Sequence, residues 1–309
     1  MGRKPRATPE ALRTPSALAR ACQVSPARLQ QVASNPEAFY SSFPIPKPTG
    51  GTRIITPPVK WLRDVHRRLL EETEPLVRFP SHVCGGVKGR SIICHAGRHV
   101  GRELVVTLDI RRFYPSTTTT QVAAALQRLV PPDVARLAAA VCTYNGGLPQ
   151  GSPISMFLAN LVFLPADRRF HRLARRHGLA YSRYVDDLAI SGDADFRRLK
   201  GPFLDIIAAH GYEAAPEKLR VRFRDRAQVV TGLVVNERLR PTRAYCSGVK
   251  QMIWNCIDHG SQLMADEVGM SIKRLKERLT GQVRFIAQFH PRLGKKLKGL
   301  LCRLWQPPE

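Results

Sequence analysis

The sequence contains no long hydrophobic run. A helix that spans a membrane needs roughly 18 or more consecutive apolar residues, and no such stretch occurs in the chain. The N-terminal sequence MGRKPRATPEALR also lacks the apolar segment of a secretory signal peptide. We therefore expect a soluble, cytoplasmic protein with no membrane partner.

Paired cysteine motifs and the common nucleotide-binding loops are also missing. The seven cysteines are scattered and none forms a CxxC pair, a distribution typical of buried thiols rather than of disulfides. Cys94 lies near His95 and His99, but the spacing matches no established zinc pattern. Neither a Walker loop nor a GxGxxG sequence occurs, so nucleotide binding by those devices is not supported.

Acidic residues are scarce relative to basic ones. The chain has 24 Asp and Glu against 49 Lys and Arg, which gives a formal net charge of +25. A balance this basic indicates a polyanionic partner, most often nucleic acid. Hydrophobic residues make up 43% of the 309 positions, enough for a packed interior divided among two or three subdomains.

The order of predicted elements indicates an α+β fold rather than a regular βαβ series. Helical periodicity and capping residues occur near both ends of the chain, and strand patterns occur between them. The expected strands and hairpins cover 43–58, 103–110, 180–192 and 219–236. The expected helices cover most of 8–40, 61–77, 117–145, 156–178, 195–211 and 238–309.

Two adjacent aspartates stand out in the stretch 181-YSRYVDDLAISG-192. Asp186 and Asp187 repel each other unless a cation sits between them, although Asp is also favoured in hairpin turns. Asp109 ends the predicted strand LVVTLD, and carboxylates from two segments make an oxygen-rich site suited to Mg²⁺. Two such ions about 3.5–4 Å apart can clamp a phosphoryl displacement. A basic chain with one acidic cluster predicts a metal-dependent enzyme that acts on nucleic acid.

Five blocks, in this order, resemble the motifs of a reverse transcriptase, an RNA-directed DNA polymerase. They are IPKPTGGTRII at 45–55, LDIRRFY at 108–114, LPQGSPIS at 148–155, YVDD at 184–187 and GYEAAPEKLRV at 211–221. The resemblance covers roughly residues 40–236. It implies a right-hand polymerase fold with fingers, an antiparallel palm sheet with helices, and a helical thumb. The implied parts are an N-terminal helical segment at 1–40, fingers at 41–103, a palm at 104–236 with a helical insertion at 120–147, and a thumb at 237–309.

Two further segments resemble the bacterial retron branch of this family. VVTGLVVN at 229–236 is similar to a Val-Thr-Gly element, and SIICHAGRHV at 91–100 is similar to an Asn-Ala-x-x-His element, with His95 in place of Asn. The resemblance implies a bacterial enzyme that uses a structured non-coding RNA as template and primer. DNA synthesis from dNTPs would start at an internal guanosine 2′-hydroxyl and leave a branched RNA–DNA product. It also implies anti-phage defence with an effector protein encoded nearby.

Two alternatives remain open from the sequence. One is an abortive-infection or group II intron-like reverse transcriptase with a different priming mode. The other is a catalytically idle polymerase fold that serves as an RNA-binding scaffold. The intact set of Asp109, Asp186 and Asp187 disfavours the scaffold, because a substituted carboxylate would be expected there.

The resemblance assigns roles to individual residues. The catalytic metal ligands would be Asp109, Asp186 and Asp187, with two Mg²⁺ ions and Mn²⁺ as a possible substitute. The residues implied at the dNTP site are Lys47, Arg53, Phe113, Tyr114, Gln150, Gly151 and Lys218. Either Phe113 or Tyr114 would be the aromatic gate that excludes a ribose 2′-hydroxyl, and the other would be core. Lys47 and Lys218 are alternatively surface lysines, and Gln150 and Gly151 alternatively form a plain turn.

A last group of residues would contact RNA or DNA. Tyr184 would pack beneath the primer end, or is simply an aromatic residue that suits a strand. His95, Arg98 and His99 would grip the structured RNA, or the histidines are satisfied within a loop. The thumb residues implied at the phosphate backbone are Lys250, Arg274, Lys295 and Lys296.

Overall fold

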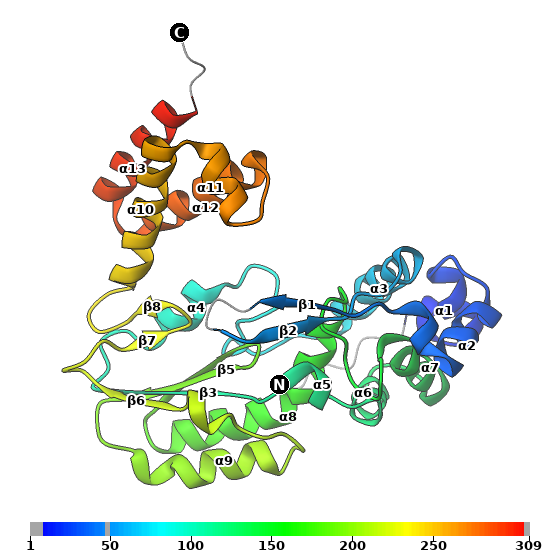
Figure 1. Cartoon of the computed structure of the whole chain (residues 1–309). Coiled ribbons are helices and arrows are strands. Elements are labelled where there is room, and N and C mark those ends of the chain that lie inside the picture. The colour runs from blue at the N-terminus through cyan, green and yellow to red at the C-terminus, as the bar shows by residue number, and fades with distance from the viewer. Residues whose placement is uncertain (1–8, 47–49, 306–309) are drawn as a thin grey trace.

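The computed structural model describes residues 9–46 and 50–305 and confirms the expected α+β class. Figure 1 shows a central sheet with helices beneath it, a second group of helices beside it, and a helical bundle that stands apart from both. The central sheet is the palm. Its strands are β3 (Leu104–Asp109), β4 (Ala180–Tyr184), β5 (Asp187–Gly192) and β6 (Arg220–Phe223), all antiparallel and in the order β4-β5-β3-β6.

Alternation along the palm strands separates a packing face from a face that carries the aspartates. Leu104, Val106 and Leu108 of β3 join the main hydrophobic core, whereas Val105 joins a different cluster on the other side. Because side chains alternate along a strand, Asp109 lies on the same face as Val105. The helices α8 (Ser155–Arg176) and α9 (Lys200–Ala208) cover the packing face (Figure 1). The aspartate face is therefore left free of these helices.

The first two α-helices begin at residues whose side chains cap them. The Thr14 and Ser25 hydroxyls accept hydrogen bonds from the backbone N–H groups of Ala17 and Arg28 at 3.1 and 3.2 Å. A proline follows each cap at the first helical position, where its missing N–H costs nothing. The helical elements of this part are η1 (Glu10–Leu12), α1 (Pro15–Ala21), α2 (Pro26–Ser34), η2 (Pro36–Phe39), α6 (Thr119–Leu126) and α7 (Pro132–Cys142).

An exposed hairpin reaches out from the body as the finger element. Its strands β1 (Phe43–Pro46) and β2 (Thr52–Ile55) pair antiparallel and bury almost nothing by themselves. The elements between the hairpin and the first palm strand are α3 (Lys60–Thr73), η3 (Glu74–Leu76) and α4 (Ile92–Gly97). The short elements α5 (Phe113–Ser116), η4 (Arg197–Leu199) and η5 (Pro216–Lys218) lie between palm strands in the chain.

The thumb is a four-helix unit with its own core. Its helices are α10 (Arg243–His259), α11 (Ser261–Glu267), α12 (Ile272–Phe289) and α13 (Pro291–Leu304). Leu275, Leu279 and Val283 repeat at helical spacing along α12 and are buried, while the charged residues between them face solvent. A small sheet of β7 (Val229–Val230), β8 (Leu233–Val234) and β9 (Arg240–Pro241) precedes the thumb. Within the described ranges, every helix is too short or too polar to cross a membrane.

A buried ion pair lies under the palm sheet. Arg183 of β4 and Asp167 of α8 are both fully buried, and their side chains form a bidentate pair at 2.7 and 2.9 Å. The remaining donors of Arg183 bond the Asn160 side chain at 2.9 Å and the Val185 carbonyl at 2.7 Å. The Tyr181 hydroxyl donates to the same Asp167 carboxylate at 2.7 Å. The pair thus joins α8, β4 and the turn that follows β4.

Replacement of Arg183 with Met is expected to destabilise the protein by about 3–5 kcal/mol, because Asp167 is then left buried without a cation. Arg183→Met combined with Asp167→Leu should recover a large part of this loss, since no unpaired charge remains. Urea denaturation followed by circular dichroism measures both free energies of unfolding. The matched control is Arg67→Met, which removes the exposed partner of Asp64 and should cost less than about 1 kcal/mol. A loss for Arg183→Met no larger than the control's would contradict the prediction.

Several histidines are held neutral in the interior. His66 on α3 is fully buried, and its ring nitrogens bond the Ser152 hydroxyl at 2.8 Å and the Val141 carbonyl at 3.0 Å. Burial lowers the pKa of His66 to about 4, and the bond to the Val141 carbonyl opposes this shift. Burial likewise lowers the pKa of His82 to about 4 and that of His95 to about 3.

Acid should therefore destabilise the protein through its buried histidines, at pH values where carboxylates of ordinary pKa are still ionised. The unfolded chain binds protons at histidine near pH 6.5, but the folded chain binds one at His66 only near pH 4. Between these values the unfolded state holds more protons, so stability is complete above about pH 6.5 and falls as the pH decreases. His66 alone contributes on the order of 3 kcal/mol to this loss.

Urea titrations between about pH 7.5 and 4.5 measure the effect. The variant His66→Asn keeps a polar side chain that does not titrate, and its stability should decline less steeply with acid than that of the wild-type chain. Parallel declines of the two proteins would show that His66 does not take part.

Candidate active site

The palm strands bring two of the three predicted catalytic aspartates directly opposite each other. Asp109 at the end of β3 is the register partner of Asp187 at the start of β5. Cβ atoms of such cross-strand partners lie roughly 4.5–5.5 Å apart, so the two carboxylates share one small region. Asp186 precedes β5 in the turn, and its carbonyl accepts a hydrogen bond from the Ile110 N–H at 3.1 Å. The structure thus gathers Asp109, Asp186 and Asp187 at one end of the sheet.

The turn between β4 and β5 is conformationally constrained. Val185 has φ +60°, an uncommon value that strains a β-branched residue. Gly85 passes so close that a Cβ there would lie 2.4 Å from the Val185 backbone nitrogen. From the packing face, Arg183 holds the Val185 carbonyl at 2.7 Å. The position of Asp186 and Asp187 is therefore set from both sides of the turn.

The three carboxylates repel one another. Burial is the largest cause that raises the pKa of Asp187, to about 7, and the Asp186 and Asp109 charges raise it further. The pKa of Asp186 is also raised, first by burial and then by Asp109. Lys218 compensates part of this negative charge, because its ammonium donates a hydrogen bond to the Asp109 carboxylate at 2.7 Å. Burial opposes the charge of Lys218, but the bond to Asp109 and the nearby carboxylates raise its pKa.

The residues fit a hard divalent cation by their chemistry, because carboxylate oxygens are the donors that such ions prefer. The mutual repulsion that raises the pKa values of Asp186 and Asp187 is what a bound cation would relieve. In the described part of the chain, no group of three or more His, Cys, Asp or Glu side chains is already arranged in a metal-holding geometry.

The structure separates the two candidates for the aromatic gate. Phe113 is 2% exposed and packs against Phe163 and Tyr212 in the core, with ring centroids 5.7 and 5.6 Å apart. Tyr114 is only partly buried, and burial together with the Asp186 charge raises the pKa of its hydroxyl to about 12. Tyr114 therefore lies within electrostatic range of the carboxylates, whereas Phe113 belongs to the core.

The loop with Gln150 and Gly151 packs against the base of the finger hairpin. The Thr56 N–H donates to the Gln150 carbonyl at 2.6 Å. Gly151 has φ +122°, a backbone conformation that favours glycine. A Cβ at this position would also lie only 3.0 Å from the Ile55 side chain. Arg53 on β2 is exposed, and its charge lowers the pKa of Asp186. The hairpin thus presents Arg53 to the carboxylates, while Lys47 lies outside the described residues.

The two histidines expected to contact RNA lie inside the fold instead. His95 and His99 are both 0% exposed. The imidazole of His95 hydrogen-bonds the Ser182 hydroxyl at 2.7 Å, and that of His99 bonds Ser191 at 2.7 Å. The expectation of RNA contact is therefore wrong for these side chains, because α4 and the turn that follows it pack them against hydroxyls on the aspartate face of the sheet. The alternative of a satisfied histidine describes His99, whose two ring nitrogens bond the Ser191 and Ser182 hydroxyls, whereas the buried Nε2 atom of His95 has no hydrogen-bond partner among the described residues.

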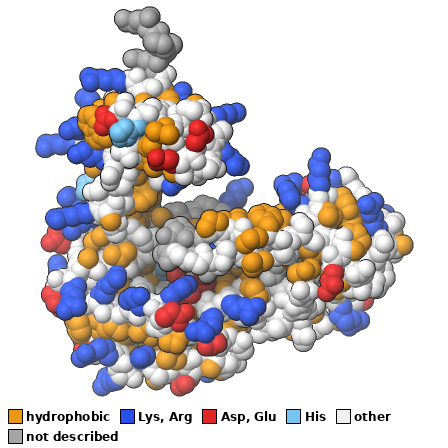
Figure 2. All heavy atoms as spheres, in the orientation of Figure 1, with side chains coloured by type: hydrophobic (Ala, Val, Ile, Leu, Met, Phe, Trp, Pro, Cys, Tyr) orange, Lys and Arg blue, Asp and Glu red, His pale blue; other side chains and the backbone are white. Residues whose placement is uncertain are grey.

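The other predicted nucleic-acid residues remain accessible in part or in full. Tyr184 is half-buried, is the register partner of Asp187, and has its ring 6.2 Å from the His95 ring. Arg98 is half-buried and donates to the Ser81 carbonyl at 2.8 Å, so it braces a loop. The predicted thumb residues all face solvent, and Figure 2 shows Lys and Arg side chains over the visible thumb surface. They are Lys250, Arg274, Lys295 and Lys296.

Sequence reasoning missed the residues that support the turn. The turn that carries Asp186 is positioned by four residues outside it, which are Arg183, Asp167, Asn160 and Gly85. One signal was available: Arg183 occupies the strand position two residues after Tyr181, which faces the core. An arginine at an inward position of a buried strand requires an acidic partner.

Comparison with known proteins agrees with this geometry. Residues 45–243 match the family model described as "Reverse transcriptase (RNA-dependent DNA polymerase)". The chain is 36% identical to the retron Mx65 reverse transcriptase of Myxococcus xanthus over 225 residues, which cover 66% of this chain and 53% of that protein. It is 30% identical to the retron Mx162 reverse transcriptase of the same organism over 93% of this chain and 66% of that protein.

The chain therefore spans between about half and two thirds of the length of these relatives. Among solved structures, a foamy viral protease-reverse transcriptase in complex with double-stranded DNA superposes with a TM-score of 0.49 at 17% identity, over 85% of this chain and 38% of that one. The matched family model covers the finger hairpin, the palm and every residue of the carboxylate cluster. The chain belongs to the reverse transcriptase (RNA-dependent DNA polymerase) family, and its sequence resembles the retron reverse transcriptases.

Proposed function

We propose that the protein is a retron-type RNA-directed DNA polymerase that adds dNTPs to a growing DNA strand on an RNA template. The observation that carries the proposal is the placement of Asp109 opposite Asp187, with Asp186 in the adjoining turn. Carboxylates from two segments held by one sheet suit in-line nucleotidyl transfer. The similarity to retron reverse transcriptases supports RNA as the template.

We assign separate roles in this reaction to individual residues of the chain. Asp109, Asp186 and Asp187 would hold two Mg²⁺ ions, or Mn²⁺ in their place; when bound, such ions activate the primer hydroxyl and neutralise charge on the triphosphate. Arg53 offers a guanidinium fork to the phosphate oxygens, with Lys47 as its neighbour on the hairpin. Gln150 and Gly151 form the floor under the incoming base.

The remaining assignments concern the two ends of the nucleotide. Lys218 lies 2.7 Å from Asp109 and stays protonated, so it can stabilise or protonate the leaving pyrophosphate. Tyr114 presents its ring beside the carboxylates and would exclude a ribose 2′-hydroxyl. Tyr184, Arg98, Lys250, Arg274, Lys295 and Lys296 would contact the template and product strands.

The priming mode and biological setting form the finer part of the proposal. By similarity to retron reverse transcriptases, the template and primer would be one structured non-coding RNA. Synthesis would begin at an internal guanosine 2′-hydroxyl and give a branched RNA–DNA molecule. An effector protein and a role in anti-phage defence in the bacterial cytoplasm complete the proposal.

Expression of the protein with its native flanking DNA tests the proposed function. Nucleic acid extracted from the purified protein should contain a short discrete DNA that is joined to RNA and changes mobility after either RNase or DNase treatment. The variant Asp186→Asn/Asp187→Asn should yield none, because the substitutions remove the carboxylate charges needed for metal binding. A DNA species of equal yield in this variant would refute catalysis by these aspartates, and its absence from both proteins would refute retron-type priming.

Tyr114 is expected to select deoxynucleotides. In Tyr114→Ala the steric barrier to a 2′-hydroxyl is lost, so the ratio of kcat/KM for a dNTP to that for the matching NTP should fall by about 100-fold or more. Extension of an oligo(dT) primer on poly(rA) with dTTP or UTP measures this ratio.

The matched control for the gate is Phe113→Leu, which alters the neighbouring aromatic residue in the core. It should lower the thermal midpoint but leave the dTTP to UTP ratio within about threefold of the wild-type value. A larger loss of selectivity in Phe113→Leu than in Tyr114→Ala would reverse the assignment.

A further inference from the structure

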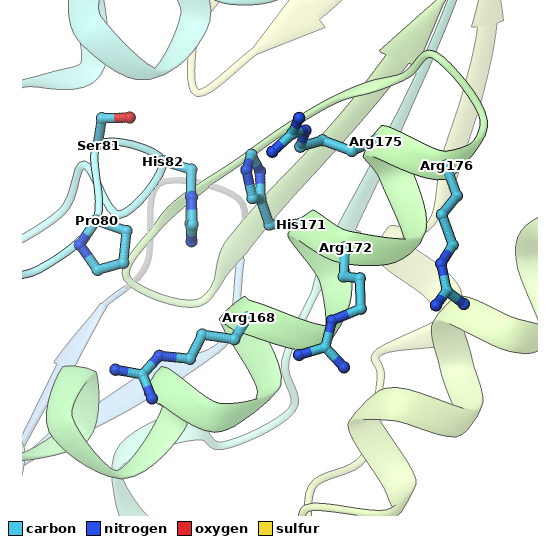
Figure 3. Close-up of a pocket in the computed structure, with 8 residues that line it drawn as sticks. All are labelled: Pro80, Ser81, His82, Arg168, His171, Arg172, Arg175 and Arg176. Carbon is cyan, nitrogen blue, oxygen red and sulfur yellow. The ribbon is translucent and has the colours of Figure 1, made fainter. Parts of the chain in front are cut away.

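A basic hollow lies at the end of α8, separate from the carboxylate cluster. It has a volume of about 680 Å³ and lies between α8 and the 79–83 loop. Figure 3 shows His171 and four arginines on α8, with His82 facing His171 from the loop. The arginines are Arg168, Arg172, Arg175 and Arg176. No Asp or Glu is among the described residues that line the hollow.

The arginines form one uncompensated positive surface. They are exposed, and within the described ranges none of the four takes part in a salt bridge. The nearby Asp167 is turned inward and is neutralised by Arg183. On the opposite side of α8, Phe163, Phe170 and Ala174 are buried in the core, which fixes the direction in which the arginines point. Their charge is therefore available to a ligand.

The wall opposite the arginines is held rigidly. Arg90 donates to the Phe79 carbonyl at 2.8 Å, and Arg98 donates to the Ser81 carbonyl at 2.8 Å. The segment that follows pairs with the free edge of β4, since the Arg183 N–H donates to the His82 carbonyl at 2.8 Å. A loop fixed in this way loses little entropy when a ligand binds.

The hollow also presents a stacked pair of imidazoles. The rings of His82 and His171 lie 4.5 Å apart with an angle of 20° between their planes. His82 is only 5% exposed, and its Nε2 atom has no hydrogen-bond partner among the described residues. His171 is partly exposed and forms the outer ring of the stack. An unsatisfied buried nitrogen beside an accessible aromatic face is a feature expected of a binding site.

Distance separates this hollow from the reaction centre. Helix α8 begins at Ser155, directly after the loop of Gln150 and Gly151, and rises about 1.5 Å per residue. Arg168 and Arg176 are thus roughly 20 and 30 Å along the helix from that loop. The helix also covers the face of the sheet opposite to Asp109. A template–primer seated on the carboxylates cannot fill the hollow with the same nucleotides.

We propose that this hollow binds the phosphate backbone of a structured RNA, at a segment outside the copied template. Each basic group is an arginine, whose planar fork matches phosphate oxygens and whose face stacks on bases. Arg168 and Arg172 are four residues apart on one helix face, about 6 Å along the axis, a step similar to that between successive phosphates of one strand. The exposed His171 ring offers a stacking surface for an unpaired base, which RNA loops provide. The inference rests on the proposed function, because it requires an RNA longer than the template.

The test compares two triple variants of the full chain. Arg168→Gln/Arg172→Gln/Arg175→Gln removes three charges from the hollow, and the matched control Arg128→Gln/Arg136→Gln/Arg198→Gln removes three exposed charges elsewhere. The probe is a labelled transcript of the native flanking DNA. We expect the hollow variant to bind it about tenfold or more weakly than the control, with a salt slope smaller by roughly two to three. A variant with three lysines in place of the same arginines should recover only part of the affinity, because charge returns without the fork.

Further measurements distinguish the remaining outcomes. Thermal midpoints within about 2 °C of wild type establish that both variants are folded. Equal losses in the two triple variants would overturn the proposal, and so would an equal loss with a DNA strand of the same sequence as probe. Unchanged RNA binding with loss of binding to polyglutamate would assign the hollow to an acidic protein instead. The wild-type chain could also fail to extend oligo(dT) on poly(rA) while the difference in RNA binding between the two triple variants remains. That result would refute the proposed polymerase activity but support the proposed RNA-binding site.

Discussion

The geometry of the active site depends on one buried ion pair. Arg183 and Asp167 are withdrawn from water completely, which costs several kcal/mol per ion unless each polar atom finds a partner. Here Asp167, Asn160 and the Val185 carbonyl take the guanidinium donors, so the cost is offset by four hydrogen bonds. These bonds connect the long helix of the palm to the turn that carries Asp186. A change in the pair therefore affects the core and the catalytic turn together.

The two faces of the palm sheet differ in composition. One face packs against helices, and the other carries the carboxylates of the proposed active site. The face toward α8 is apolar apart from the Arg183 pair, and it supplies rigidity. The opposite face carries Asp109 and Asp187, and burial, followed by the neighbouring Asp186 and Asp109 charges, raises the pKa of Asp187. The free energy gained by packing on the face toward α8 holds these like charges close together. The proposed binding of a divalent cation would relieve their repulsion.

Much of the site was predictable from sequence because it depends on local patterns. A strand that ends in Asp109 and a hairpin that contains Asp186 and Asp187 follow from alternation and turn chemistry, and antiparallel pairing brings them together. The burial of His95 and His99 was not predictable, because their partners Ser182 and Ser191 are about 90 residues away in the chain. The periodicity of the sequence also does not predict which of the two adjacent aromatic residues, Phe113 or Tyr114, is buried in the core.

The net charge of +25 also acts on the fold itself. Like charges at this density repel one another and weaken the compact state, and a bound polyanion removes that repulsion. A ligand that binds only the folded chain stabilises it further in proportion to the logarithm of its concentration. The basic thumb and the arginines at the end of α8 lie in different parts of the molecule, so one nucleic acid that neutralises both has to span the distance between them. The charge distribution therefore suits a ligand that extends well beyond the carboxylate cluster.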